Sequence, residues 1–209
     1  MQKLSKTECF MASIIKTKVR TLIIFRGGVT FSGGEALLQI DELEPLLRKL
    51  EEEHIHRAVE TCLFIPRVNL EKAIELIDLF YVDAKILDED ICRATLKGNL
   101  SLYFSNIDKL IKSGKPIVIR IPVIGGYTDD EKNRGKVVEL LTRYEEYDNL
   151  LKVEIIKEHN LGINKYKSLK ECNDAWSIPD YKGVLDELME QYKAEIEATV
   201  KIPVEICKI

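Results

Sequence analysis

From residue 28 onward, short β-branched runs alternate with longer amphipathic stretches along the 209-residue sequence. The short runs predict six strands, at residues 29–32, 57–62, 79–83, 117–121, 153–156 and 204–207. The stretches between them repeat apolar residues at helical spacing and predict helices at residues 36–53, 69–78, 107–113, 130–144 and 182–199. This alternation predicts an α/β fold on a largely parallel sheet, either open and doubly wound or closed part-way into a barrel.

The length suits one domain with an appendage better than two complete domains. Hydrophobic residues make up 45% of the chain and charged residues 32%, with both signs mixed, which is typical of a globular protein rather than a disordered one. Residues 1–26 lack the strand-to-helix rhythm and are predicted to be an N-terminal appendage. Residues 27–209 are predicted to form the single folded domain.

The charge and the apolar runs exclude several classes of protein. A formal charge of -4 is too small and too dispersed for a nucleic-acid-binding surface. Residues 22–25 form an apolar run bracketed by Arg20 and Arg26, far shorter than a membrane span, and lysines interrupt the start of the chain where a secretory signal would need an apolar core. We therefore expect no nucleic-acid or membrane partner and a cytoplasmic location.

Polar or charged residues follow five successive predicted strands. Because the carboxyl ends of parallel strands share one edge, these side chains are predicted to gather there: Ser32 to Glu35, Glu60, Asp83, Lys85, Arg120 and His159. Strand ends are often polar simply because the chain emerges into water, which is the alternative for each residue alone. Glu60 and Asp83 lie inside apolar runs, where an unpaired charge is costly, so both are expected to have partners.

The segment GGVTFSGGE at residues 27–35 places two glycines and a glutamate between a strand and a helix. Backbone amides at such a turn favour an anion, but the Glu35 carboxylate would repel a phosphate. A ligand with both an ammonium and a carboxylate group, such as an amino-acid headgroup, fits better. The alternative is a tight turn in which Glu35 serves only the helix start.

These residues resemble the radical S-adenosylmethionine activases of glycyl radical enzymes, the pyruvate formate-lyase-activating enzyme-like family. The segment GGVTFSGGE followed by LLQ is similar to the family's glycine-glycine-glutamate region. Four later segments are also similar to the family, and together the resemblance covers residues 27 to about 170: HRAVETCLFIP (56–66), VDAKILD (82–88), RIPVIGGYTDD (120–130) and HNLGINKYKSL (159–169).

The resemblance implies a partial parallel (β/α)6 barrel of the radical SAM type with S-adenosylmethionine at its open rim. Carried over by position, the residues that bind the cofactor are Gly33, Gly34, Glu35, Glu60, Asp83, Lys85, Arg120 and His159. In this family a 4Fe-4S cluster, reduced by flavodoxin or ferredoxin, cleaves S-adenosylmethionine to make a glycyl radical on a partner such as pyruvate formate-lyase. No residue of this chain is assigned a catalytic or metal-binding role.

The cysteines depart from the family pattern. The family holds its cluster with a CxxxCxxC motif upstream of the glycine region, and this chain has only Cys9 there. The other four, Cys62, Cys92, Cys172 and Cys207, are scattered and match no disulfide framework or short-spaced metal site. The chain is therefore expected to be a form truncated at its amino end and inactive by itself. The alternative is a cluster-free protein that binds S-adenosylmethionine or a partner without radical chemistry.

Overall fold

The computed structural model describes residues 27–158 and 183–207. Within them, six strands form one sheet in the order β1-β2-β3-β4-β5-β6, and every neighbouring pair is parallel. The strands are β1 (Gly28–Phe31), β2 (His56–Thr61), β3 (Leu79–Asp83), β4 (Ile117–Val123), β5 (Leu150–Lys157) and β6 (Val204–Cys207). A helical segment connects each described pair of successive strands from β1 to β5, as a parallel sheet requires.

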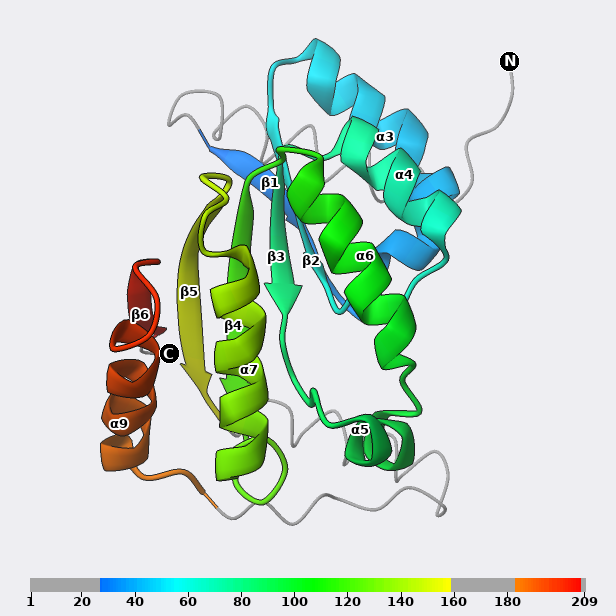
Figure 1. Ribbon diagram of the computed structural model, residues 1–209. Helices are drawn as coiled ribbons and strands as arrows, with labels where there is room; N and C mark the ends of the chain where they lie inside the picture. Colours follow the sequence, from blue (N-terminus) through cyan, green and yellow to red (C-terminus); the bar gives the residue numbers. More distant parts are fainter. Residues whose placement is uncertain (1–26, 159–182, 208–209) are drawn as a thin grey trace, which may run out of the picture.

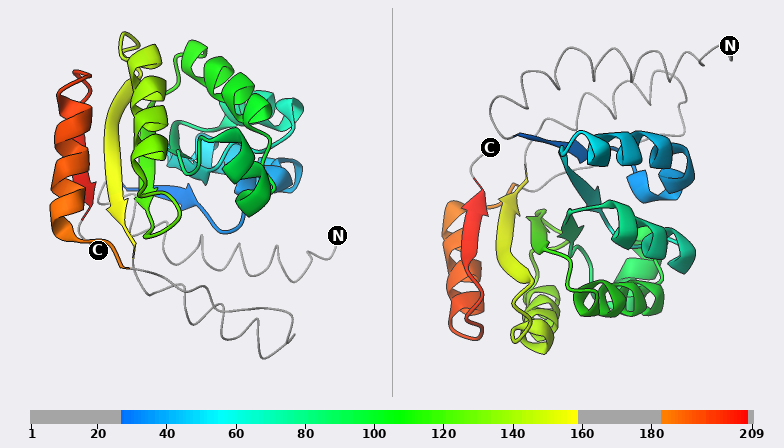
Figure 2. Two further views of the ribbon diagram at one scale, coloured as in Figure 1. Left: turned by 60° about the horizontal axis from the view of Figure 1, so that its bottom comes forward. Right: turned by 90° about the horizontal axis from the view of Figure 1, so that it is seen from above.

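The helical segments are η2 (Ala36–Gln39, a 3-10 turn), α3 (Ile40–Glu52), α4 (Arg67–Leu76), α5 (Glu89–Leu96), α6 (Leu100–Lys112), α7 (Glu131–Tyr144) and α9 (Asp186–Glu197). Figure 1 shows the longer helices packed against one side of the sheet, and the right-hand view of Figure 2 shows that this is the outer side of a curved sheet. The described residues thus form a partial parallel barrel that is not closed, as predicted.

Side chains along the strands alternate between a buried outer face and an inner face that carries charged as well as apolar residues. Side chains that point toward the helices, such as Val59, Phe80 and Ile119, are at most 1% exposed and form the core. Among the alternate residues, which point to the inner face, Glu60 and Arg120 are only partly buried. Parallel sheets are usually apolar on both faces, so charged residues on the inner face mark it as a surface for something polar.

All six predicted strands are confirmed, with boundaries that differ by up to three residues. The helices were predicted less well: the helix expected at residues 107–113 begins at Leu100, and α5 was not expected. Both starts carry a capping signal, because the side chain of Asn99 accepts a hydrogen bond from Leu102 N and that of Asp88 accepts one from Ile91 N. Both capping residues can be recognised in the sequence, so the two helix starts could have been predicted from them.

No helix among residues 27–158 and 183–207 has the length and apolar character needed to cross a membrane. The predicted appendage, residues 1–26, lies outside the described residues, so the division of the chain at residue 26 stays a prediction.

Candidate functional site

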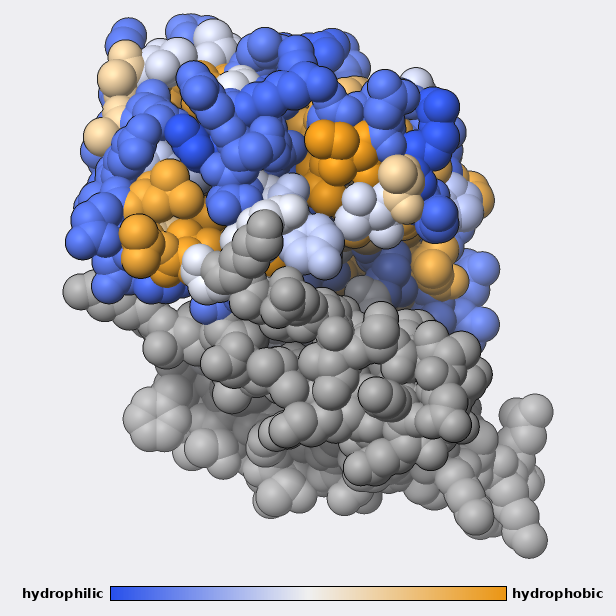
Figure 3. Space-filling model, turned by 90° about the horizontal axis from the view of Figure 1, so that it is seen from below, coloured by the Kyte–Doolittle hydropathy of each residue, from blue (hydrophilic) through white to orange (hydrophobic). Residues whose placement is uncertain are grey.

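The carboxyl ends of the strands share the lower edge of the sheet in Figure 1. Figure 3 looks on to this edge from below and shows hydrophilic residues around separate apolar patches. All the predicted site residues that the structure describes lie at this edge or on the inner face next to it. His159 lies outside the described residues, directly after Glu158 at the end of β5.

The turn after β1 leaves backbone open to a ligand. Gly33 and Gly34 have φ angles of 101° and 62°, which L side chains rarely adopt. A Cβ added at either glycine would meet no atom within 4 Å among the described residues. The glycines are therefore needed for the conformation of the turn, and both leave the main chain accessible.

Glu35 joins this turn to the end of β2. One carboxylate oxygen accepts hydrogen bonds from Thr61 Oγ1 at 3.0 Å, Cys62 N at 2.8 Å and Cys62 Sγ at 3.0 Å. The other accepts a bond from Leu37 N at 3.3 Å and so caps η2. Burial and then the nearby Glu35 carboxylate raise the pKa of Cys62 to about 11, so this thiol stays protonated at neutral pH and donates to Glu35.

Glu60 and Arg120 form an ion pair across the inner face. Arg120 Nη1 lies 2.6 Å from Glu60 Oε1, and Ser32 Oγ donates to Glu60 Oε2 at 2.5 Å. Burial by itself would raise the pKa of Glu60, but the bonds from Ser32 and Arg120 outweigh it, so the pKa of this carboxyl is lowered. Glu60 is therefore ionised at neutral pH, and it links β2 to β4 and to the turn after β1.

The Arg120 guanidinium keeps unused hydrogen-bonding capacity. Its Nε is buried without a hydrogen-bond partner in the described part of the chain, and Glu154 Oε2 approaches it only to 3.9 Å. The guanidinium carbon lies 5.7 Å from the centre of the Tyr81 ring. Glu154 and Tyr81 were not predicted as site residues, although Glu154 lies in an apolar run like Glu60 and could have been found by the same argument.

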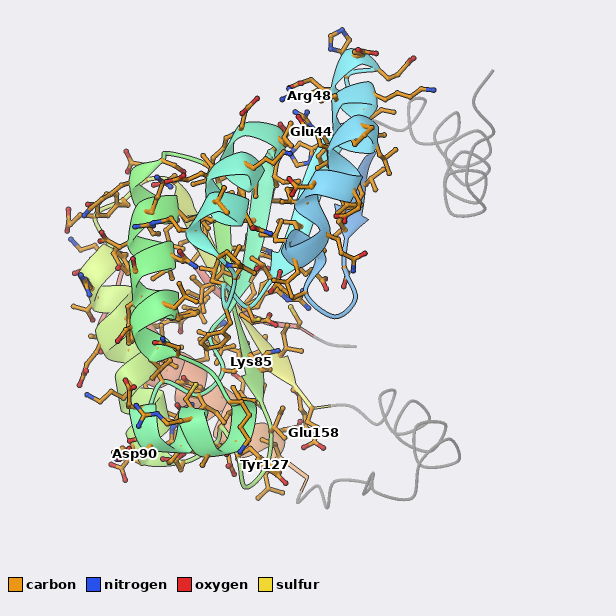
Figure 4. The ribbon with its side chains drawn as sticks, turned by 90° about the vertical axis from the view of Figure 1, so that its right-hand side faces the viewer. Glu44, Arg48, Lys85, Asp90, Tyr127 and Glu158 are labelled. Carbon is orange, nitrogen blue, oxygen red and sulfur yellow. The ribbon has the colours of Figure 1, made fainter. Side chains whose placement is uncertain are left out.

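Asp83 and Lys85 form a second ion pair, 3.2 Å from Oδ2 to Nζ, with 24% and 38% of their side chains exposed. Asp83 pairs with Arg120 in the sheet register, so the two ion pairs are neighbours. Burial raises the pKa of Asp83, and Lys85 offsets only part of that rise. Figure 4 shows Lys85 near the end of the sheet that also carries Tyr127 and Glu158.

The structure therefore brings together most of the residues that the sequence singled out. Glu60 with Arg120 and Asp83 with Lys85 form adjacent ion pairs, and Glu35 holds the glycine turn against the next strand. The edge offers two cations, several carboxylates and open main chain, which suits a small zwitterionic ligand with further polar groups.

The comparison with protein families agrees with this arrangement. The Radical SAM superfamily matches residues 14–134, more than half of the chain. This chain belongs to the radical SAM superfamily. The match includes the glycine turn, both ion pairs and the first four strands of the sheet.

Among curated relatives, this radical SAM chain is 31% identical over 153 residues to the choline trimethylamine-lyase activating enzyme of Oleidesulfovibrio alaskensis, covering 73% of the chain and 48% of the relative. It is 32% identical over 187 residues to the pyruvate formate-lyase-activating enzyme of Staphylococcus aureus, covering 86% and 72%. The chain spans about half the length of the first curated relatives it matches. The resemblance to activases of glycyl radical enzymes is thereby confirmed.

Solved structures support the fold. A crystal structure of a domain of pyruvate-formate lyase-activating enzyme from Bacteroides vulgatus matches with a TM-score of 0.69 and 24% identity, covering 87% of this chain and 99% of that one. A radical SAM methyltransferase from Sphaerobacter thermophilus matches with a TM-score of 0.68 and 13% identity, covering 94% and 55%. At these identities the likeness concerns the fold alone.

Membership of the radical SAM superfamily implies S-adenosylmethionine and a 4Fe-4S cluster as the family's cofactors. The described cysteines do not fit the cluster: Cys62 follows β2, Cys92 is buried in α5 and Cys207 ends β6. Nowhere in residues 27–158 and 183–207 do three histidine, cysteine or acidic side chains gather as a metal site would need.

The carboxyl edge of the sheet does fit S-adenosylmethionine, because it combines exposed glycine backbone, paired charges and an Arg120 Nε without a hydrogen-bond partner in the described residues.

Proposed function

We propose that the carboxyl edge of this sheet binds S-adenosylmethionine. The observation that carries the proposal is the pair of adjacent, partly exposed ion pairs beside an open glycine turn. S-adenosylmethionine has an ammonium, a carboxylate, a sulfonium and ribose hydroxyls, so its recognition needs both signs of charge and polar backbone at close range. The edge supplies each of these.

The charged groups of S-adenosylmethionine can be assigned to residues of opposite charge at the edge. Glu35 and the main chain of Gly33 and Gly34 would hold the amino group, because the Glu35 carboxylate is fixed at the turn. Lys85 and Arg120 would meet the carboxylate, since their own acidic partners leave them partly exposed.

Acidic side chains complete the proposed site. Glu60 and Asp83 would accept hydrogen bonds from the ribose hydroxyls, and His159 is proposed on the adenosine side by its position after β5. Bound S-adenosylmethionine supplies the carbon–sulfur bond that radical chemistry of this family breaks.

We further propose that this protein activates a glycyl radical enzyme. The activating enzymes among its relatives support this, and pyruvate formate-lyase is one candidate partner. Reduced flavodoxin or ferredoxin would donate the electron, and a cytoplasmic location stays a prediction. The alternative is a protein that binds S-adenosylmethionine or a partner without radical chemistry, which the scattered described cysteines favour.

Calorimetric titration of the chain with S-adenosylmethionine tests the binding site. Glu35→Ala is expected to weaken the affinity by roughly 1 to 3 kcal/mol, because it removes a charge-assisted hydrogen bond. Glu35→Gln keeps an acceptor for capping η2 and separates loss of charge from loss of structure. Glu44→Ala is the control, because Glu44 pairs with Arg48 on α3, away from the edge (Figure 4). Unchanged affinity in both Glu35 variants would remove this residue from the site.

Anaerobic reconstitution with iron and sulfide distinguishes the two candidate functions. The chain by itself is expected to form no stable 4Fe-4S cluster and to release no 5'-deoxyadenosine from S-adenosylmethionine, because its described cysteines lie apart. Visible absorption and product chromatography provide the readouts. Formation of both cluster and product would show that the chain supplies the ligands itself and would exclude the cluster-free alternative.

A further inference from the structure

A buried asparagine joins the two loops that follow β3 and β4. Asn133, in the first turn of α7, is 2% exposed. Its Nδ2 donates to Lys85 O at 2.9 Å and to Thr128 O at 3.2 Å, while its Oδ1 accepts from Leu87 N at 2.8 Å. One side chain thus satisfies three main-chain groups from two loops.

These bonds begin where the sheet ends. The last bond between β3 and β4 that holds this segment runs from Ala84 N to Arg120 O, at 2.8 Å. Lys85, Ile86 and Leu87 belong to no strand or helix, although Ile86 and Leu87 are 3% and 5% exposed. Buried main-chain groups need partners, and Asn133 provides the ones that the sheet no longer does.

Asn133 is itself firmly held. Its backbone N–H donates to the capping carboxylate of Asp130 at 3.0 Å. Thr128, 3% exposed, fixes the loop from inside: its hydroxyl donates to Pro122 O at 2.7 Å and accepts from Ile124 N at 2.8 Å. Asn133 therefore ties the main chain of Lys85 to the loop of Thr128, which is itself held by hydrogen bonds.

We propose that Asn133 is a positioning residue for Lys85, setting the backbone from which the lysine reaches a ligand carboxylate. The inference rests on the proposed function, because it takes Lys85 as a contact of S-adenosylmethionine. A lysine side chain is flexible, so its amine can be placed only if its main chain is fixed. The 3.2 Å contact between Lys85 and Asp83 then limits where the amine points.

Asn133→Ala and Asn133→Asp remove the two donated bonds, and the aspartate keeps an acceptor for Leu87 N. Asn149→Ala is the matched control. Asn149 Nδ2 also donates to two carbonyls, Ile111 O at 3.0 Å and Lys115 O at 2.8 Å, but it lies before β5 at the opposite edge of the sheet. All three variants should lower the melting temperature. The decrease in Asn149→Ala shows how much stability is lost when a buried asparagine away from the site is removed.

The affinity for S-adenosylmethionine, measured by calorimetry, separates positioning from stability. Asn133→Ala should weaken binding by about tenfold, as misplacing a binding group does, while Asn149→Ala should leave it within about twofold. In a Lys85→Met background, Asn133→Ala should change the affinity by less than about twofold, because the group it positions is gone. Equal weakening in both backgrounds would overturn the proposal.

Two readouts without ligand keep this inference separate from the proposed function. Hydrogen exchange at Leu87 N should accelerate by about 100-fold in Asn133→Ala and stay unchanged in Asn149→Ala. Acylation of the Lys85 amine, followed by mass spectrometry, should change rate only in the Asn133 variants. If the wild-type chain binds no S-adenosylmethionine, the proposed function fails, and the acylation result still decides whether Asn133 positions Lys85. An unchanged acylation rate would exclude it.

Discussion

Two arginines of the same sheet differ in how many of their guanidinium nitrogens have partners in the protein. Arg57 lies on β2 at the amino edge, with 8% of its side chain exposed. It donates to Asp78 twice, from Nε at 2.9 Å and from Nη2 at 2.7 Å. Its remaining nitrogen lies 3.0 Å from Glu51 and 3.5 Å from Leu47 O. All three of its nitrogens are engaged by the protein.

Arg120, on β4 near the carboxyl edge, has 23% of its side chain exposed and a strong contact to Glu60. Its Nε has no hydrogen-bond partner in the described residues. A saturated guanidinium stabilises the fold but has nothing left for a ligand, whereas an unsaturated one beside an accessible turn can bind an anionic group. The degree of saturation, more than burial or charge, separates the structural arginine from the proposed binding arginine.

The largest effect is expected for Arg57→Ala. Removing the guanidinium takes this donor from Glu51 and from Leu47 O, and it leaves Asp78 only the bond from the main-chain N–H of residue 57. The free energy of unfolding should therefore fall by about 3 kcal/mol. Urea denaturation measures this change. Arg57→Lys keeps the positive charge but cannot make the paired bonds to Asp78, so its free energy of unfolding should lie between those of the wild type and Arg57→Ala. A loss below about 0.5 kcal/mol for Arg57→Ala would break the comparison, because it would make the saturated network unimportant.

A smaller effect of a different kind is expected for Arg120→Ala. The affinity for S-adenosylmethionine should fall by about tenfold, or about 1.4 kcal/mol, because a cation facing the ligand carboxylate is lost. The free energy of unfolding should change by less than about 1 kcal/mol, since the pair is partly exposed. Calorimetry and urea denaturation on the same sample measure both. A stability loss as large as that of Arg57→Ala, with unchanged affinity, would contradict the assignment.

The smallest effect expected is on the pH dependence of stability, through Asp78 beside Arg57 and Asp83 beside Lys85. Bonds from Arg57 outweigh burial and lower the pKa of Asp78, so Asp78 stabilises the fold above its unfolded pKa, and this contribution is lost as pH falls. Burial raises the pKa of Asp83, so its contribution is present below its unfolded pKa and lost as pH rises through the folded value. At pH 7, Asp83→Asn should therefore raise the free energy of unfolding by up to about 1 kcal/mol, whereas Asp78→Asn should lower it.

Thermal unfolding between pH 4 and pH 8 checks these signs, with the wild-type chain as reference. A loss of stability at pH 7 in Asp83→Asn would show that the ion pair with Lys85 outweighs the burial of the carboxylate. That result would place Asp83 with the structural network rather than with the proposed site.

The strands could be predicted from the sequence because each is a short apolar run bounded by turn residues. The start of α6 could not be predicted from its apolar pattern alone, because it depends on a cap at Asn99. Of the site residues, Glu60 and Asp83 were predicted because a charge in an apolar run demands a partner. The same argument applies to Glu154, whereas Asn133 lies among polar residues at a helix start and carries no such signal.

The sequence by itself determined the order of the strands along the chain, the edge on which polar groups gather and the family, because these follow from local periodicity and motifs. Only the tertiary structure decided which charges are saturated: Arg57 is enclosed by groups of α3 and by Asp78, just before β3, whereas Arg120 keeps an unpaired Nε in the described residues. Hydrogen-bond saturation depends on distances between residues far apart in the chain, and sequence spacing does not fix those distances.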